Sequence, residues 1–445
     1  KNCEEVEDMA YVPRQRRYKV RWKVVAPLLV LIALIVYLLI GMFLPSNHQE
    51  VKKFTVCGLN EEQTIKALHK TSKETISVSD YLYYGESLDL YEKKYSPENK
   101  DTLSGKTVEL KNICDGKTIS MTMENTVDQK ILLDEIPEGY YEVSIIDNLV
   151  KKRVIFQQPL KENAFYTAQR KGKVNKVSLI ADTQLLKDYQ ITLDKNYLFL
   201  QVTSQTPRKG DIDVLIDPFG MNTDLTWLPD EGSKVNGLNE NDEMYKAAVL
   251  MKKELEEKYG LRVAITKASK DEKGKAYGSD GRLAKGYKQH AKYYLFLRFS
   301  NYANDTIRGF EVAHSYYSSK TLARNLTYGV HKNLKMPLSP MYTGSDAGIV
   351  TGLLAEGADG KTIYDTNLYL RESGGRATLA GKYSETSQEQ NADFVNANGM
   401  QGLEIDFVYI SNKEDAALWK KQKNAIIKET ARAFAEGINA DNTTR

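Results

Sequence analysis

The sequence predicts a membrane-anchored protein of several domains: one N-terminal transmembrane helix, a β-sandwich-like middle domain, and a C-terminal α/β domain whose mostly parallel sheet is flanked by helices. Three observations support this prediction. A long uncharged segment lies near the N-terminus, short strand-like segments fill the middle of the chain, and strand and helix patterns alternate in the second half. The 445 residues are enough for two or three domains.

The overall composition argues against one class of partner. The net charge is only +3, with 27% charged residues, so nothing in it indicates nucleic-acid binding. Tyrosine is common, with 28 residues against 12 phenylalanines, which fits either strand-rich surfaces or sugar-binding faces. The three cysteines match no metal-binding spacing, and so few cysteines do not predict a disulfide framework.

The predicted transmembrane helix spans residues 24–44. This segment contains no charged residue and would extend about 31 Å as a helix, enough to cross a bilayer. No small-residue cleavage pattern follows it, which favours a permanent anchor over a cleaved signal peptide. Basic residues crowd its N-terminal side, so the tail of residues 1–23 is predicted to be cytoplasmic. The bulk of this single-pass protein is then extracytoplasmic, at the cell membrane.

Residues 52–205 form the predicted β-rich domain. Short alternating or apolar segments, separated by turn residues, are typical of an all-β sandwich. The segments are Thr107–Leu110, Lys117–Met123, Ile131–Leu133, Tyr140–Ile146, Arg153–Phe156 and Tyr197–Thr203. Such a domain could bind glycan or a protein, and it could equally be a spacer that holds the next domain away from the membrane.

Residues 211–441 form the predicted α/β domain, in which strands and helices alternate. Strands are expected at Asp213–Ile216, Leu261–Thr266, Tyr294–Phe299 and Leu403–Phe407. Helices are expected at Asn241–Tyr259, Arg282–Ala291, Leu322–Asn333 and Ala416–Gly437. Two further segments, Met341–Lys361 and Ser373–Gln401, are polar and are predicted to be either recognition loops or disordered.

Eight short motifs follow one another in this domain. They are Ile216-Asp-Pro-Phe-Gly-Met-Asn222, Glu240-Asn-Asp242, Thr266-Lys267, a helix beginning at Arg282, Phe296-Leu-Arg-Phe-Ser-Asn301, Gly309-Phe-Glu-Val312, Leu370-Arg-Glu372 and Leu403-Glu-Ile-Asp-Phe407. Each motif alone is weak. In this order the eight resemble the zinc-dependent N-acetylmuramoyl-L-alanine amidases, which cut the bond between muramic acid and L-alanine in peptidoglycan.

The resemblance implies a zinc site, and this chain departs from it. The family binds zinc with a histidine, a glutamate and a second histidine, and leaves one position open for water. The first histidine place falls at Gly220 and the second at Ser300, so Glu240 is the only metal ligand that remains. Glycine has no donor atom and serine is a poor zinc ligand. We therefore expect no cofactor here.

Other groups of the family site are retained. Glu404 stands at the place of the catalytic glutamate, which orients the water and moves its proton, and its alternative role is a structural ion pair. Arg282 and Arg371 are predicted to be structural or to position the substrate. Among the five histidines, His314 is the nearest replacement for a lost ligand, but none has a paired metal-binding spacing, which favours structural or surface roles.

Three hypotheses about function follow. The first is a pseudo-enzyme: a bacterial, wall-facing domain that binds peptidoglycan or a cell-envelope protein without cutting. The second is an active amidase with a rebuilt zinc site that uses Glu240, His314 and another group. The third is a purely structural role in an envelope complex. In none of them is nucleic acid a partner.

Overall fold

The structure is a computed structural model. It describes residues 22–43, 74–93, 103, 106–123, 131–156, 164–181, 195–223, 230–276, 278, 280–340, 346–358, 360, 363–374 and 398–441. The chain forms two compact units, Lys1–Thr55 and Val56–Arg445. Most of the predicted loop Ser373–Gln401 falls outside the described residues. Most of Met341–Lys361 is described, and it contains two short strands, Ile349–Thr351 and Leu354–Glu356, where the sequence predicts a recognition loop or disorder.

The first unit contains one described helix. Helix α1 spans Trp22–Phe43, where the sequence predicts the anchor, and it includes Pro27. Among the described residues, no helix qualifies as long and apolar enough to cross a bilayer. The membrane anchor therefore stays a prediction.

The first part of the second unit is built from strands, as the sequence predicts. They are β1 (Thr75–Val78), β2 (Asp80–Tyr84), β3 (Ser87–Tyr91), β4 (Thr107–Asn112), β5 (Thr118–Thr122), β6 (Ile131–Leu132), β7 (Gly139–Asp147), β8 (Val150–Phe156), β9 (Ala164–Tyr166), β10 (Val174–Ala181) and β11 (Leu198–Gln205). A short 3-10 helix, η3 (Leu133–Glu135), precedes β7. One sheet has the order β1-β8-β7-β11-β10-β9, with β4 joined to β7 and β5 joined to β4.

A second, smaller sheet completes this β part. Its order is β21-β2-β3-β6, and β21 (Asn398–Gly399) comes from the far end of the chain. One apolar cluster contains Tyr83 and Leu88 from this sheet and Val143 and Val177 from the larger one. The two sheets therefore pack face to face around a common core, which is the arrangement of a sandwich.

Two details fix the strand ends of the β part. The hydroxyl of Tyr141 donates to the carbonyl of Pro137 at 2.8 Å, which closes the turn that leads into β7. Cys114, in the turn between β4 and β5, is disulfide-bonded. The composition did not lead us to expect this bridge.

The second part alternates strands and helices. The strands are β12 (Val214–Pro218), β13 (Lys234–Val235), β14 (Leu238–Asn239), β15 (Val263–Ile265), β16 (Tyr293–Ser300), β17 (Glu311–His314), β18 (Ile349–Thr351), β19 (Leu354–Glu356), β20 (Ile363–Asp365) and β22 (Gln401–Tyr409). The helices are α4 (Glu240–Tyr259), α5 (Arg282–Lys288), α6 (Thr321–Leu334), α7 (Leu368–Gly374) and α9 (Lys413–Gly437). Most predicted boundaries lie within one or two residues of these.

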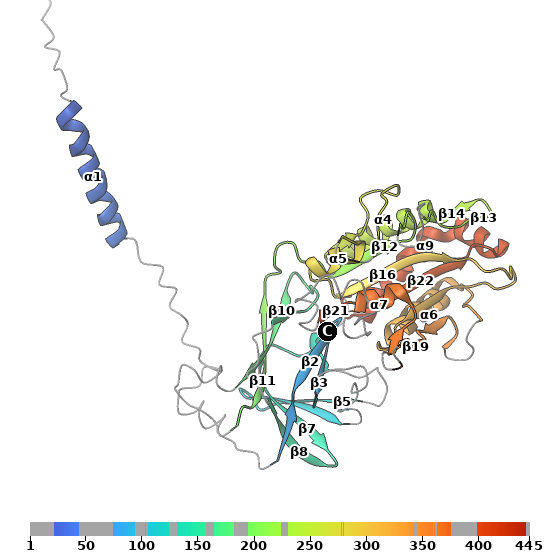
Figure 1. Cartoon of the computed structure of the whole chain (residues 1–445), viewed down its shortest axis with the longest axis horizontal. Coiled ribbons are helices and arrows are strands. Elements are labelled where there is room, and N and C mark those ends of the chain that lie inside the picture. Colours follow the sequence, from blue (N-terminus) through green and yellow to red (C-terminus); the bar gives the residue numbers. More distant parts are fainter. Residues whose placement is uncertain are drawn as a thin grey trace, which may run out of the picture. The chain divides into compact units, whose positions relative to one another are not determined.

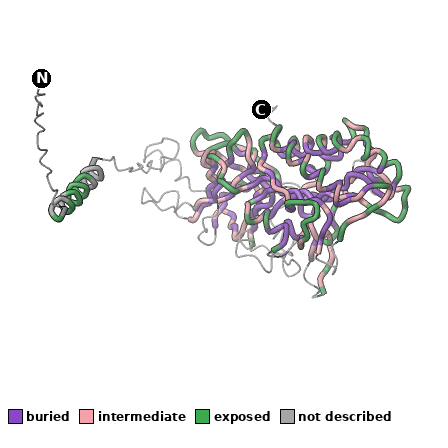
Figure 2. The backbone as a smooth tube through the Cα atoms, turned by 90° about the horizontal axis from the view of Figure 1, so that it is seen from above, coloured by how far each residue is buried: buried purple, intermediate pink, exposed green. Residues whose placement is uncertain are grey.

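The central sheet has the order β15-β12-β16-β22-β17-β18 (Figure 1). Among its described strands only β17 and β22 pair antiparallel, so the sheet is mostly parallel. Helices α4, α6 and α9 share one apolar cluster with Leu295 and Leu297 of β16. Helices α5 and α7 pack with Tyr294 and Phe296, whose side chains point to the opposite face. In Figure 2 the buried residues run through the interior of the second unit and the exposed ones lie toward its outside.

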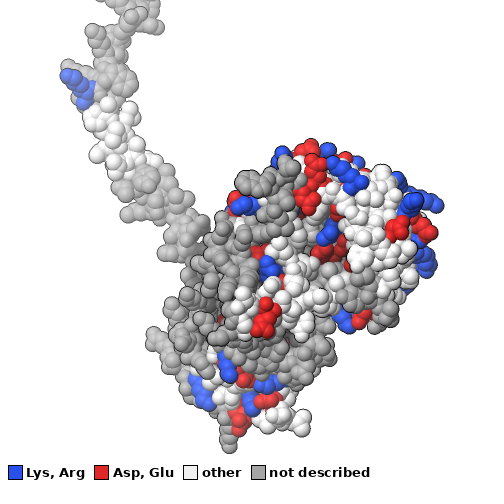
Figure 3. All heavy atoms as spheres, turned by 45° about the vertical axis from the view of Figure 1, so that its right-hand side comes forward, with Lys and Arg blue, Asp and Glu red and all other residues white. Residues whose placement is uncertain are grey.

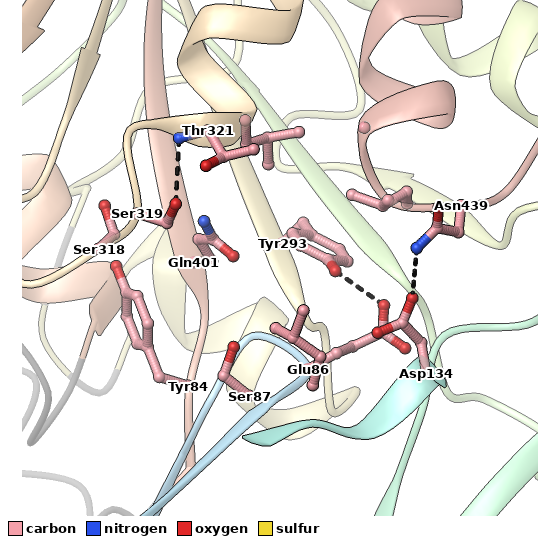
Figure 4. A pocket seen from close by; sticks show the side chains of 14 residues that line it. Tyr84, Glu86, Ser87, Asp134, Tyr293, Ser318, Ser319, Thr321, Gln401 and Asn439 are labelled. Atoms are coloured by element: carbon pink, nitrogen blue, oxygen red, sulfur yellow. Dashed lines mark hydrogen bonds between the residues drawn. The ribbon is translucent and has the colours of Figure 1, made fainter. Parts of the chain in front are cut away.

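Buried polar contacts join the β part to the α/β part. Glu86, in the turn between β2 and β3, accepts hydrogen bonds from Tyr293 at 2.7 Å and from both terminal nitrogens of Arg170. Arg170 also donates to the carbonyl of Ile438, after α9. A cavity of about 150 Å³ lies beside these groups, and Glu86, Asp134 and Tyr293 are among the residues that line it (Figure 4). The two parts thus pack as one unit, and the domain boundary between residues 205 and 211 stays a prediction.

Candidate functional site

The sheet and helix α4 bring the predicted site residues to one place. Strands β12, β16 and β22 are parallel neighbours, so their carboxyl ends lie at the same edge of the sheet. Gly220 follows β12, Ser300 ends β16, and Glu404 lies on β22. Glu240 is the first residue of α4, and its carboxylate reaches the backbone of β16.

At the first histidine place, the backbone itself excludes a side chain. Gly220 has φ +114°, a conformation that side chains rarely adopt. A Cβ added there would lie 2.7 Å from Cβ of Asn241, closer than any ordinary contact. Lys267 and Arg282 both donate to the carbonyl of Gly220, at 3.0 and 3.2 Å. These contacts hold the loop in a form that has no room for a ligand residue.

The remaining ligand place, Glu240, is tied to the backbone. Its Oε1 accepts from the N–H of Phe299 at 2.8 Å, and its Oε2 accepts from the N–H of Ser233 at 2.9 Å. The side chain is 2% exposed, and burial raises its pKa although these hydrogen bonds and Arg298 oppose the shift. Glu240 therefore acts here as a structural acceptor that connects α4 to β16.

At the second histidine place, Ser300 is also engaged. Its hydroxyl donates to Oδ1 of Asp406 at 2.8 Å. Asp406 lies on β22 and is 4% exposed. Burial raises the pKa of Asp406 well above its ordinary value, and Glu404 and Glu311 add to that shift while Arg298 opposes it. The carboxyl group of Asp406 thus shares the site with Ser300.

An arginine lies among these acidic groups. Arg298 Nη1 donates to Oε1 of Glu404 at 3.0 Å, and its Nε lies 3.4 Å from Oδ1 of Asp406. Arg298 and Asp406 are direct neighbours in the register of β16 and β22. Burial opposes the charge of Arg298, but Glu404, Asp406 and Glu240 outweigh burial, so its pKa is raised. The guanidinium of Arg298 therefore keeps a positive charge in this site.

Each carboxylate oxygen of Glu404 accepts a hydrogen bond. Arg298 binds one carboxylate oxygen, and the side-chain amide of Asn367 donates to the other at 2.6 Å. Glu404 is 7% exposed. The ion pair that the sequence offered as an alternative role is therefore present, and its partner is Arg298.

These residues do not suit zinc. A zinc site needs three protein ligands with nitrogen, sulfur or carboxylate donors around an open position. Gly220 supplies none, Ser300 is committed to Asp406, and Glu240 accepts two backbone hydrogen bonds beside a guanidinium. Among the described residues, no group of three or more His, Cys, Asp or Glu side chains could hold a metal ion.

The described histidines are engaged elsewhere. His314 is 3% exposed, its Nε2 lies 3.0 Å from the hydroxyl of Thr351, and its Nδ1 lies 2.9 Å from the carbonyl of Ser315. His314 pairs with Leu403 in the register of β17 and β22, so its side chain points to the face opposite Glu404. His290 contacts Asp211, and His331 contacts the carbonyl of Met336. His48 and His69 lie outside the described residues.

The two predicted substrate-binding arginines lie in polar networks. Arg282 is 8% exposed and lies 3.2 Å from Asp217, a carboxylate that also accepts from Tyr294 and Thr266. Arg371 contacts Glu372 at 3.4 Å and donates to the carbonyl of Asp365 at 3.2 Å. Both arginines thus have structural partners, and their role toward a substrate stays a prediction.

Three residues of the site were missed by sequence reasoning: Arg298, Asp406 and Asn367. Two of them carried a signal. Arg298 interrupts an otherwise apolar strand, and Asp406 follows Glu404 by two residues, on the same face of its strand. Opposite charges on neighbouring strands indicate an ion pair. Asn367 lies in a loop and gave no such signal.

One comparison with known proteins identifies a family for the second part. Residues 228–440 match the family described as N-acetylmuramoyl-L-alanine amidase. The match begins after the first motif, so the assignment of Gly220 to the first histidine place stays a prediction. No curated protein matches the chain.

Several solved amidase structures are similar to the chain. One is an amidase from Neisseria meningitidis, at 18% identity, covering 51% of this chain and 96% of that chain, with a TM-score of 0.32. Another is the catalytic domain of CwlV from Bacillus (Paenibacillus) polymyxa var. colistinus, at 14%, covering 51% and 96%, with a TM-score of 0.33. A third is CwlD from Clostridioides difficile in complex with the GerS lipoprotein, at 12%, covering 52% and 97%, with a TM-score of 0.33.

The motifs in their order and the family match lead to the same assignment. The chain carries, over residues 228–440, a domain of the N-acetylmuramoyl-L-alanine amidase family.

Proposed function

We propose that this protein is a membrane-anchored, wall-facing pseudo-amidase that binds peptidoglycan, or a cell-envelope protein, without cutting the bond between muramic acid and L-alanine. One observation supports the proposal: Arg298 forms ion pairs with Glu404 and Asp406, and its charge also interacts with Glu240. Zinc would lower the pKa of its bound water from 15.7 to about 7. Without it, Glu404 has no activated water on which to act.

The hydrogen bonds made by Glu404 support binding over catalysis. Glu404 is bound by Arg298 and Asn367, which leaves it poorly placed to accept a proton from water. On the face shown in Figure 3, basic and acidic side chains are interspersed. That surface suits a largely uncharged ligand such as a glycan strand more than a polyanion.

The proposed location is the cell membrane, with the N-terminus in the cytoplasm. The uncharged segment 24–44 and the basic residues before it support a single-pass anchor. The disulfide at Cys114 supports an extracytoplasmic position for the β part, because disulfides persist in oxidising compartments.

Metal analysis and wall hydrolysis test the loss of catalysis. The 445-residue chain, purified in detergent and incubated with zinc, should retain far less than one equivalent of the metal and release no stem peptide from purified peptidoglycan. One equivalent of zinc, lost in Glu240→Ala together with hydrolysis and kept in the surface variant Glu256→Ala, would establish an active amidase instead.

A second experiment tests ligand binding. The same protein should be retained on insoluble peptidoglycan and released by soluble wall fragments. Failure to be retained would favour the third hypothesis, in which the domain contacts only proteins of the envelope.

A further inference from the structure

A cavity of about 150 Å³ lies where the β part contacts the amidase domain, apart from the site described above. The turn between β2 and β3, the helix η3, the loop before α6 and the end of α9 all contribute residues to its wall. Its described lining residues include neither Arg298 nor Glu404. Leu132 and Asn439, which lie on the wall, are exposed, so a small molecule can reach the cavity from solvent.

Several polar side chains on the wall are available to a ligand. Within the described part of the chain, the hydroxyls of Ser87 and Thr321 and the side-chain amide of Gln401 make no hydrogen bond. In Figure 4, Gln401 lies between Tyr84 and Tyr293, and the hydroxyl of Ser87 points toward it. Hydroxyl and amide groups can each donate and accept. The wall therefore offers donors and acceptors that the fold leaves unused.

A carboxylate completes this set of polar groups. Oδ2 of Asp134 accepts from the side-chain amide of Asn439 at 2.8 Å, whereas Oδ1 has no partner among the described residues. Figure 4 shows Asp134 and Asn439 next to each other at one end of the cavity. Burial and the charge of Glu86 raise the pKa of Asp134 to about 6, so the group is ionised at neutral pH and acts only as an acceptor.

The charges near Asp134 favour a neutral ligand. Both terminal nitrogens of Arg170 donate to Glu86, and Nη2 of Arg170 lies 3.9 Å from Oδ2 of Asp134. An anionic ligand would meet the carboxylates of Glu86 and Asp134, and a cationic ligand would meet the guanidinium of Arg170. A ligand without charge avoids both repulsions.

The wall also contains apolar surface, from Leu322, Ile438 and the ring of Tyr84, all of them buried. Polar cavities hold water in solution, and a ligand that replaces this water must supply matching hydrogen bonds. A ring that carries several hydroxyls meets both requirements. Its C–H groups can pack on the apolar residues, while its hydroxyls donate to Asp134 and exchange hydrogen bonds with the unused polar groups.

We propose that this cavity is a second ligand site, which binds one neutral sugar ring or a cyclic polyol of the same size. The polar groups that recognise its hydroxyls are the side chains of Ser87, Asp134, Thr321 and Gln401. At about 150 Å³ the cavity lies below the roughly 300–1,000 Å³ of pockets for larger ligands, so it accepts a single ring and not a glycan strand. This site is independent of the pseudo-amidase assignment, because it uses none of the residues at the family site.

Saturation-transfer NMR and titration calorimetry on the 445-residue chain, in a detergent without a sugar headgroup, test this site. The probes are sugars of the gluco, galacto and manno series, each as the neutral methyl pyranoside, the uronate and the 2-amino sugar. At least one methyl pyranoside should bind, about fivefold or more tightly than the charged sugars of its own series. Cyclohexanol, a six-membered ring with one hydroxyl, should bind about fivefold or more weakly than that pyranoside.

A matched pair of variants locates the binding. Gln401→Leu nearly keeps the size of the side chain but removes its amide, and it should weaken binding of the best methyl pyranoside by about fivefold or more. Gln289→Leu is the control, because Gln289 is also partly exposed and is not among the described residues that line the cavity. Its affinity should stay within about twofold of the unaltered protein. Asp134→Asn removes the carboxylate, should weaken binding to a similar extent, and decides the question if Gln401→Leu fails to fold.

Four outcomes would overturn the proposed sugar site. They are no binding of any methyl pyranoside, tighter binding of a uronate or a 2-amino sugar, equal binding of cyclohexanol, and unchanged affinity in Gln401→Leu and Asp134→Asn. None of them bears on metal content or wall hydrolysis, which test the pseudo-amidase assignment separately.

Discussion

Gly220 cannot act as a metal ligand, and its backbone conformation and packing leave no room for a residue that could. Its φ of +114° suits glycine alone, and the space where a side chain would begin is filled by Asn241. Asn241 is itself fixed, because it accepts from Lys267 at 3.1 Å and donates to the carbonyl of Lys270 at 2.9 Å. Replacing Gly220 and Ser300 by histidine would therefore not rebuild the site, since the loop must move first.

Gly220→Ala is expected to lower the free energy of unfolding by about 2–4 kcal/mol, from backbone strain and overpacking together. Urea denaturation measures this change. Gly274→Ala is the control, because nothing lies within 4 Å of a Cβ built at Gly274, and it should change stability by less than about 0.5 kcal/mol. Equal stability of the two variants would show that the loop accommodates a side chain at residue 220 with little loss of stability.

Lys267, which donates to the carbonyl of Gly220, makes the stability of the protein depend on pH. Burial and the charge of Arg282 lower the pKa of Lys267 to about 8, against 10.5 for an ordinary lysine. The unfolded chain then binds more protons than the native protein between pH 8 and 10.5, so this residue makes stability rise with pH over that range. Lys267→Met should flatten that rise by up to about 3 kcal/mol in urea denaturation measured from pH 7.5 to 10.5. The surface variant Lys253→Met should leave the slope unaltered.

Sequence reasoning placed Glu240 and Glu404 in one site and missed Arg298 and Asp406. The reason is physical. Motif matching asks which residues stand at the known ligand places, whereas charge compensation occurs between neighbours on adjacent strands, and strand register is not visible in one sequence. The alternation of β16 and β22 shows that Arg298 and Asp406 point to one face, but only the pairing brings them together.

At the scale of elements, the long periodic segments were predictable and the short ones were not. Helix α4 begins at Glu240 and ends before Gly260, whose φ of 65° closes it, much as the sequence predicts. The pair β13 and β14 and the two-residue strand β21 were missed, because two residues carry no periodicity. The antiparallel placement of β17 also depends on tertiary packing.

The 3-10 helix η3 carries a titrating group at the junction of the two parts. Burial and the nearby charge of Glu86 raise the pKa of Asp134 from 3.8 to about 6, while Arg170 and Asn439 oppose the shift. The native protein then binds more protons than the unfolded chain between about pH 4 and 6. Stability from this group therefore falls as pH rises through that window and stays lower above it.

Asp134→Asn removes this titration. Relative to the unaltered protein, the variant should gain up to about 3 kcal/mol of stability between pH 4 and pH 7, measured by urea denaturation at a series of pH values. Asp115→Asn provides a contrast, because the backbone N–H of Lys117 lowers the pKa of Asp115 and the side chain is exposed. The effect of Asp115→Asn on stability should be small, and its dependence on pH should have the opposite sign. A stability difference between Asp134→Asn and the unaltered protein that does not change with pH would contradict the prediction.

For the whole molecule, the sequence suggested two domains in series, and the structure joins them in one unit. Composition and periodicity change near residues 205–211, which made a boundary reasonable. What they could not reveal is the buried network of Glu86, Arg170 and Tyr293, whose members are far apart in the chain. The β part therefore contacts the amidase domain through these residues, and its role as a binding domain or as a spacer stays a prediction.

This integration predicts a single unfolding transition for the second unit in scanning calorimetry. Tyr293→Phe removes a buried hydrogen bond to Glu86 and should lower stability by about 1–2 kcal/mol without splitting the transition. Tyr302→Phe, at a side chain that is 53% exposed, should leave the transition in place. Two transitions in the unaltered protein would show that the parts unfold separately.

Strand β21 has a consequence for the order in which the chain is made. It pairs with β2 through Tyr83 and Tyr84, so the edge of the smaller sheet stays open until residue 399 has been synthesised. At about 5–20 residues per second, the roughly 300 residues in between take on the order of 15–60 seconds. During that time the nascent β part exposes the unpaired edge of β2, which is open to pairing with another strand until β21 arrives.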